Sequence, residues 1–135
     1  MGNTILIVDG DEIYRKFLVD FFKARDFFAF GCARYKDAEK CLVGKRFDIA
    51  IVEYFIGKEC GERFCDFLAV RYQHETALVI TSDKQSTAIE LDIRGHSPDF
   101  YFVKPVAIDN LYAVVLRICQ SRDQKTLLRR KVLQV

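Results

Sequence analysis

The sequence has 135 residues, of which half are apolar and 13% aromatic, which is enough to bury the core of one domain. Its net charge of +2 is uneven: residues 117–135 hold six Lys/Arg and one Asp, and residues 1–116 hold fifteen Lys/Arg and eighteen Asp/Glu. The basic end lacks interleaved aromatic residues and any helix-turn-helix pattern ahead of it, so we interpret it as a solvated helix face and expect no direct nucleic-acid binding. No apolar run approaches 18 residues, and we therefore expect neither a membrane span nor a signal peptide.

The cysteines predict a reducing compartment. There are five, an odd number, without Cys-x-x-Cys spacing or paired histidines: Cys32, Cys41, Cys60, Cys65 and Cys119. This usage favours reduced thiols in the cytoplasm over a disulfide framework or a zinc site. A redox pair of Cys60 and Cys65 is the alternative to the more ordinary interpretation of buried small apolar residues.

Short apolar runs alternate with segments of helical spacing along the chain. The expected strands are residues 4–8, 27–33, 48–52, 77–81 and 99–103, and the expected helices are residues 11–25, 36–45, 61–73, 84–94 and 107 onward. Continuous Ile/Val runs are typical of strands that helices cover on both sides. The alternation therefore predicts a doubly wound α/β sheet, in which ligands bind at the carboxyl ends of the strands.

Polar residues gather at those expected strand ends. They are Asp9 and Asp11, Glu53, Thr81 with Ser82, and Lys104 before Pro105. Carboxylates can hold Mg²⁺, a hydroxyl can donate to a phosphoryl oxygen and a lysine can neutralise one, so this set is suited to handling phosphoryl groups. Each residue taken singly has an ordinary explanation, because strand ends meet water.

Four motifs in this order resemble the receiver (CheY-like) domain of two-component response regulators: "ILIVDGDE", "IAIVEYFIGKECGERF", "LVITSD" and "FYFVKP". The resemblance covers residues 4 to about 119 and implies a flavodoxin-like (βα)5 three-layer sandwich with a five-stranded parallel sheet of order 2-1-3-4-5. It also implies a receiver-like domain over residues 1–119 and a helical extension or linker over residues 120–135. The implied role is signal transduction through contacts with a signalling protein or an output domain.

The resemblance assigns roles by position. Asp9 matches the first of two adjacent metal-binding acids, and Thr81 matches the hydroxyl that senses the phosphoryl group. Lys104 matches the lysine of the last strand, and Tyr101 matches the aromatic residue that moves inward on activation. Gly61 stands where the family has the glycine that opens its third helix.

Two central positions depart from the family pattern. Glu53 stands in place of the phosphoacceptor aspartate, and Gly10 stands in place of the second metal-binding acid. The extra methylene of Glu53 displaces its oxygens, and a displacement near 1 Å costs on the order of 10²-fold in rate. The missing acid weakens any Mg²⁺ site, so we expect no cofactor and only weak Mg²⁺ binding at Asp9. Asp11 is the alternative second ligand, but its place in a first helical turn favours a capping role. Gly57 and Cys60 also depart, standing where the family has a loop proline and an acid.

These departures predict a pseudo-receiver, a non-catalytic module that is not phosphorylated at the usual site. Two interpretations of Glu53 are open: a fixed partial mimic of phosphorylation directed toward Lys104 and Thr81, or a plain ion pair with Lys104. The alternative function is a small Mg²⁺-dependent phosphatase of the haloacid-dehalogenase type, with Asp9 as nucleophile and Asp11 as general acid. That family needs a later acidic pair and an insertion after the first strand, and neither is visible in the sequence.

The last segment predicts self-association. Six of the eight residues at positions 111, 114, 118, 121, 125, 128, 132 and 135 are apolar. Such three-four spacing is that of a short coiled coil or of a connector to an output domain. A homodimer through the last helix and the C-terminal extension is therefore expected, and the alternative is a last helix packed on its own sheet.

Overall fold

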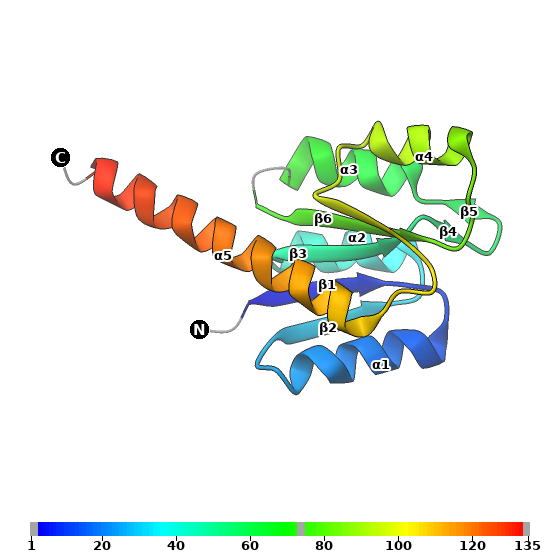
Figure 1. The fold of residues 1–135 in the computed structure, drawn as a ribbon, viewed down its shortest axis with the longest axis horizontal. Helices are drawn as coiled ribbons and strands as arrows, with labels where there is room; N and C mark the ends of the chain where they lie inside the picture. Colours follow the sequence, from blue (N-terminus) through cyan, green and yellow to red (C-terminus); the bar gives the residue numbers. More distant parts are fainter. Residues whose placement is uncertain (1–2, 73–74, 134–135) are drawn as a thin grey trace. The chain divides into compact units, whose positions relative to one another are not determined.

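The computed structural model describes residues 3–72 and 75–133, without the side chains of residues 126, 127 and 129–133. Two compact units are present, residues 1–105 and residues 106–135. The strands are β1 (Thr4–Val8), β2 (Phe28–Cys32), β3 (Ile49–Glu53), β4 (Phe55–Ile56), β5 (Glu59–Cys60), β6 (Ala77–Ser82) and β7 (Phe100–Val103). The helices are α1 (Glu12–Lys23), α2 (Tyr35–Gly44), α3 (Glu62–Tyr72), α4 (Thr87–Arg94) and α5 (Ile108–Leu133) (Figure 1).

The first unit is built on a five-stranded parallel sheet of order β2-β1-β3-β6-β7. This is the predicted order 2-1-3-4-5 when the five strands of the sheet are counted along the chain, so the predicted fold class is confirmed. Every residue of β3 and β6 is buried, and both strands lie inside the sheet, with a neighbouring strand on each side.

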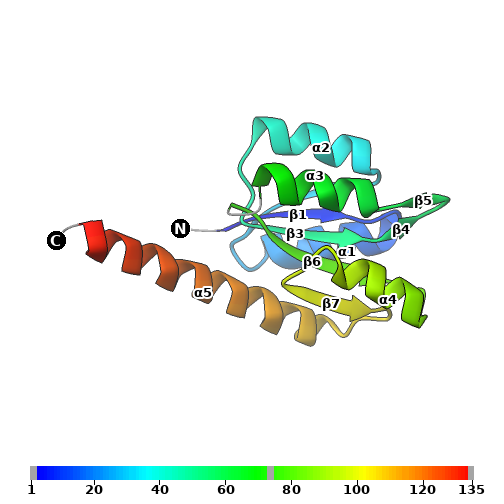
Figure 2. The same cartoon turned by 90° about the horizontal axis from the view of Figure 1, so that it is seen from above.

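Helices cover the two faces of this sheet differently. One core cluster joins Leu6 and Val8 of β1 to Leu42 of α2, Phe64 of α3 and Ile93 of α4. Figure 2 shows α2 and α3 on this face. On the other face α1 packs against β1 and β2 and buries Leu18 and Phe22. Burial of these apolar side chains is the main stabilising term for such a layered unit.

A small antiparallel hairpin, β4–β5, follows β3 and was not predicted. It pairs Phe55 with Cys60 and Ile56 with Glu59, and its turn contains Gly57 with φ of +58°. Glycine adopts this left-handed conformation without the steric cost that a Cβ adds. Gly57 therefore suits the turn of this hairpin, at a position where the resemblance implied a proline.

The second unit contains one helix, α5, which is continuous from Ile108 to Leu133. The predicted boundary between residues 119 and 120 lies inside this helix, and the division into a domain and an extension stays a prediction. Of the apolar repeat positions, 132 and 135 lie outside the described side chains, whereas Leu128 is 62% exposed. Across the described part of the chain, helices are too short or too polar to span a bilayer.

Candidate functional site at the strand ends

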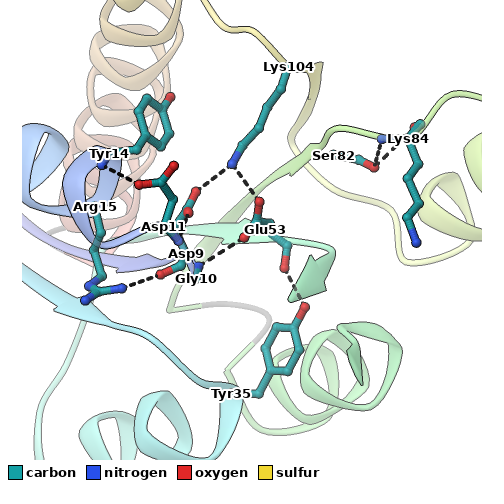
Figure 3. Close-up of polar contacts among 10 residues, drawn as sticks. All are labelled: Asp9, Gly10, Asp11, Tyr14, Arg15, Tyr35, Glu53, Ser82, Lys84 and Lys104. Atoms are coloured by element: carbon teal, nitrogen blue, oxygen red, sulfur yellow. Dashed lines mark hydrogen bonds and ion pairs between the residues drawn. The ribbon is translucent and has the colours of Figure 1, made fainter. Parts of the chain in front are cut away.

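Lys104 joins two carboxylates that come from different strands. Its Nζ donates to Asp9 Oδ2 at 2.9 Å and to Glu53 Oε2 at 2.6 Å. Figure 3 shows the lysine side chain directed between the two acids. Asp9 follows β1 and Glu53 ends β3, and we call these three residues the strand-end cluster. Its side chains are largely buried, with exposed fractions of 17% for Lys104, 4% for Asp9 and 11% for Glu53.

The parallel register explains why these residues meet. Val8 pairs with Val52, so Asp9 and Glu53 leave neighbouring strands at the same level. Lys104 follows β7, and its backbone N–H donates to Ser82 O at 2.8 Å. The carboxyl ends of parallel strands share one edge of the sheet, which brings chemistry from distant parts of the sequence together.

The Glu53 carboxylate uses both oxygens. While Oε2 accepts from Lys104, Oε1 accepts the backbone N–H of Gly10 at 3.0 Å. The main-chain carbonyl of Glu53 accepts from the buried hydroxyl of Tyr35 at 2.6 Å. The strand end and the side chain are thus both held, which defines the position of this carboxylate.

Gly10 is part of this arrangement. A Cβ at residue 10 would lie 2.9 Å from Ile56 Cγ2 and 3.6 Å from Glu53 Oε1. Real side chains do not approach a neighbour as closely as the first distance, so Ile56 would have to shift. The close approach is to Ile56 of the hairpin, whereas the distance to Glu53 is an ordinary van der Waals contact.

The Asp9 carboxylate is held from two sides. Its Oδ1 accepts the backbone N–H of Asp11 at 2.9 Å, and its Oδ2 accepts from Lys104. Arg15 donates to the Asp9 carbonyl at 2.8 Å. Asp11 itself is exposed, and its Oδ1 accepts the backbone N–H of Tyr14 at 3.0 Å. Asp11 is therefore the N-cap of α1, the role that its sequence position favours.

Thr81 lies beside Glu53 in the sheet register but is not hydrogen-bonded to it. Thr81 is 2% exposed, and its hydroxyl has no partner among the described residues. A buried hydroxyl without a partner costs free energy, on the order of 1–3 kcal/mol. Of the two residues toward which Glu53 was predicted to extend, the carboxylate contacts Lys104.

Tyr101 is on β7, partly buried against the core cluster. It borders a cavity of about 390 Å³ that Gln85, Ser86, Glu90 and Val103 also line. Burial raises the pKa of Tyr101, and a hydrogen bond with Ser82 opposes this shift. The predicted switch residue is therefore neutral and lies against an open space at the surface of the first unit.

The electrostatics of the cluster favour a charged lysine. Burial by itself would lower the pKa of Lys104, but hydrogen bonds and attraction from Asp9 and Glu53 outweigh burial, so this pKa lies above its ordinary value of 10.5. Lys104 Nζ also lies 4.9 Å from the centre of the Tyr14 ring. With one ammonium and two carboxylates, the cluster carries a formal charge of −1.

These residues do not form a donor set that fits Mg²⁺. Of the three acids that the resemblance implies, one is replaced by Gly10, and the carboxylates at the other two positions already accept hydrogen bonds from Lys104. Mg²⁺ requires a nearly octahedral set of oxygen ligands. Within the described residues, no three His, Cys, Asp or Glu side chains are grouped so that they could hold a metal ion.

The structure brings together four of the predicted site positions, Asp9, Gly10, Glu53 and Lys104, while Asp11 is a cap. Tyr35, which holds the end of β3, was not predicted. No local pattern marks it, because its partner is a backbone carbonyl 18 residues away. The phosphatase alternative finds no support, since α1 begins directly after Asp11 and that carboxylate caps the helix.

No protein-family model and no curated protein sequence matches the chain. Solved structures do match. The chain is similar to the signal receiver domain of an HD domain-containing protein from Pseudomonas fluorescens Pf-5, with a TM-score of 0.84, 14% identity and coverage of 92% of this chain and 99% of that one.

Two further solved structures support the same fold. A two-component response regulator from Clostridium difficile matches with a TM-score of 0.81 and 20% identity, over 87% of this chain and 96% of that one. A response regulator protein from Burkholderia pseudomallei, solved with a phosphorylated aspartic acid and a calcium ion, matches with a TM-score of 0.77 and 16% identity, over 93% of this chain and 74% of that one. The chain therefore has the fold of response regulator receiver domains.

Proposed function

We propose that this chain is a pseudo-receiver, a non-catalytic module of two-component or phosphorelay signalling that acts through protein contacts without phosphorylation at the usual site. The observation that carries the proposal is the position of Lys104 between Asp9 and Glu53 at 2.9 and 2.6 Å. In a receiver fold these atoms surround the point where a phosphoryl group would be transferred. In this chain the ammonium of Lys104 and the two carboxylates are instead paired with one another.

Two features oppose attack by Glu53 on a phosphodonor. Both of its carboxylate oxygens accept hydrogen bonds, from Lys104 and from Gly10. The donor set also lacks one of the acids that would hold Mg²⁺, the ion that would neutralise the charge of an incoming phosphate. A carboxylate that is paired with an ammonium ion and displaced by one methylene is a poor nucleophile for in-line transfer.

Of the two interpretations of Glu53, we favour the plain ion pair. A mimic of phosphorylation has to engage Thr81, whose hydroxyl senses the phosphoryl group in receivers that the sequence resembles. That hydroxyl has no hydrogen-bond partner among the described residues. We infer that Glu53 and Lys104 hold the domain in one arrangement in which Thr81 is not recruited.

Labelling with acetyl phosphate and Mg²⁺, followed by mass spectrometry, tests this proposal. We expect no phosphoryl adduct on the wild type and an adduct on the double variant Gly10→Asp/Glu53→Asp, which restores both acids. The matched control Gly10→Asp/Glu53→Asn should stay unlabelled, because it lacks the nucleophile. A stoichiometric adduct on the wild type would contradict the proposal.

The partners follow from the same proposal. We expect a signalling protein or an output domain as the partner, in the cytoplasm, with neither a membrane nor nucleic acid as a direct ligand. We further propose a homodimer through the last helix and residues 120–135, and support comes from the apolar three-four spacing and from the exposed side chain of Leu128.

A further inference from the structure

Two of the cysteines lie next to each other although they are nine positions apart in sequence. The Sγ atoms of Cys32 and Cys41 are 3.6 Å apart. Cys32 ends β2 and is 8% exposed, whereas Cys41 is half-buried within α2. One buried and one accessible thiol are therefore in contact, and both are reduced in this structure.

This contact is compatible with covalent closure. A disulfide has a bond length of about 2.05 Å, so the sulfurs would need to approach by about 1.5 Å. The ring would run from the end of β2 through the first two turns of α2. Rotation of the more exposed side chain, Cys41, brings the sulfurs together with the least disturbance of the core.

The ring would contain two groups that hold the strand-end cluster. The carbonyl oxygen of Cys32 accepts the backbone N–H of Asp9 at 3.1 Å. Tyr35 lies inside the same segment, and its hydroxyl donates to the Glu53 carbonyl at 2.6 Å. A disulfide between Cys32 and Cys41 would restrain both of these groups, the Cys32 carbonyl that binds the Asp9 backbone and the Tyr35 hydroxyl that binds the Glu53 backbone.

We propose that Cys32 and Cys41 are a site of reversible oxidative modification, at which a peroxide-class oxidant forms a disulfide whose effect reaches Asp9 and Glu53. This inference does not depend on whether the chain is phosphorylated. It adds to the protein-contact module an input that a phosphodonor does not supply.

The chemistry balances with hydrogen peroxide as the oxidant. The Cys41 thiolate attacks one peroxide oxygen, the O–O bond breaks, and Cys41 sulfenic acid and hydroxide result; the hydroxide takes up the proton that the Cys41 thiol had lost and becomes water. Cys32 sulfur then attacks Cys41 sulfur and displaces a second water as the S–S bond forms. Two thiols lose two electrons and two protons, and one peroxide becomes two water molecules.

The surroundings of the two thiols determine which of them reacts first. Burial, and after it the hydrogen bond with Cys41, raises the pKa of Cys32 to about 12. A buried thiol with a raised pKa is a weak first nucleophile. Cys41 is the more accessible sulfur and therefore reacts with peroxide first, and Cys32 is the resolving group because it is already in contact.

Peptide mapping of the full chain tests the site. The reduced protein is treated with equimolar hydrogen peroxide, alkylated and digested with trypsin, which cleaves after Arg34, Lys36 and Lys40 and so separates the two cysteines. We expect a linked Cys32–Cys41 peptide pair and a loss of two hydrogens from the intact mass, both reversed by dithiothreitol. Cys60→Ser, a substitution at the exposed cysteine, should leave the link unchanged, and Cys41→Ser should abolish it.

The wild-type map decides the proposal without relying on the folding of any variant. Oxidation at Cys60 alone, or a link between other cysteines, would overturn it. Hydrogen exchange measured on the same sample tests the coupling, since we expect slower exchange over residues 8–11 and 53–54 in the oxidised form. Equal hydrogen exchange in the reduced and oxidised forms would contradict the proposed effect of the disulfide on Asp9 and Glu53.

Discussion

Lys104 donates to two carboxylates that approach it from neighbouring strands, and Gly10 donates to one of them from the backbone. All three side chains of the strand-end cluster are largely buried. In such surroundings the loss of one partner costs more than the pair itself contributes, because the remaining charges are left buried and unpaired. The cluster is therefore sensitive to single substitutions and less sensitive to matched pairs.

Lys104→Met should lower the free energy of unfolding by about 3 kcal/mol, since Asp9 and Glu53 then face each other without a cation. Urea unfolding at neutral pH measures this loss. The double variant Lys104→Met/Glu53→Gln should lose less than the sum of its single substitutions, because one unpaired charge is gone. Strict additivity would show that the two residues do not interact in solution.

The raised pKa of Lys104 predicts a pH dependence of its contribution. A lysine whose pKa is higher in the folded state stabilises fully below its unfolded value, here 10.5, and the contribution disappears as the pH rises through the folded pKa. The stability difference between the wild type and Lys104→Met should thus stay constant from neutral pH to about pH 10 and shrink above it.

The control for this pH series removes the ionisable hydroxyl of Tyr14, whose ring lies next to Lys104. Burial raises the pKa of Tyr14, and Lys104 opposes that shift. Both proteins are therefore best compared in a Tyr14→Phe background, by denaturant unfolding at each pH. A stability difference that already shrinks between neutral pH and about pH 10 would contradict a raised pKa for Lys104.

At the scale of elements, the turn between β1 and α1 combines a site residue with a helix cap. Asp9 belongs to the cluster, Gly10 supplies a backbone donor, and Asp11 caps α1 through the Tyr14 N–H. The cap satisfies one of the N–H groups that a helix start leaves unpaired. The start of α1 also fixes the segment that carries Gly10.

Asp11→Ala should lower the free energy of unfolding by about 1 kcal/mol. Asp11→Asn should lower it much less, because Asn is also a good N-cap. Thermal or urea unfolding gives both values. Ser86→Ala is the matched control, since Ser86 caps α4 through the Ile89 N–H at 3.1 Å and should cost a similar amount. If Mg²⁺ stabilised the wild type but not Asp11→Ala, Asp11 would be a metal ligand as well as a cap.

At the scale of the whole molecule, the chain consists of two compact units, residues 1–105 and residues 106–135. The strand-end cluster and the thiol pair both belong to the first unit. The second contains α5, a single helix of 26 residues. A helix of that length is longer than most helices in globular proteins, which have about 11–12 residues on average.

We expect the full chain to be a dimer at micromolar concentration, and a version ending at residue 120 to be a monomer, because the apolar positions beyond residue 120 would be lost. Light scattering coupled to size-exclusion chromatography measures both masses. Leu128→Lys is a milder test that keeps the chain length, since this side chain is 62% exposed. Equal masses for the full and shortened chains would contradict the proposed dimer.

The apolar runs and the helical spacing predicted all five strands of the main sheet and all five helices to within a few residues. The ends of the predicted strands identified Asp9, Glu53 and Lys104 as candidate site residues. The hairpin β4–β5 escaped prediction because two-residue strands have no periodicity to detect. The turn residue Gly57 was noticed only as a departure from a family pattern.

The sequence by itself determined the layered α/β fold and the chemical types at the strand ends, because both depend on local periodicity and on where apolar runs stop. Only the tertiary structure decided that Lys104 bridges Asp9 and Glu53, that Gly10 donates to Glu53 and that Cys32 meets Cys41. The first three contacts join residues 95, 51 and 43 positions apart. Such contacts depend on strand register and side-chain rotamers, which the packed core sets for the whole sheet at once.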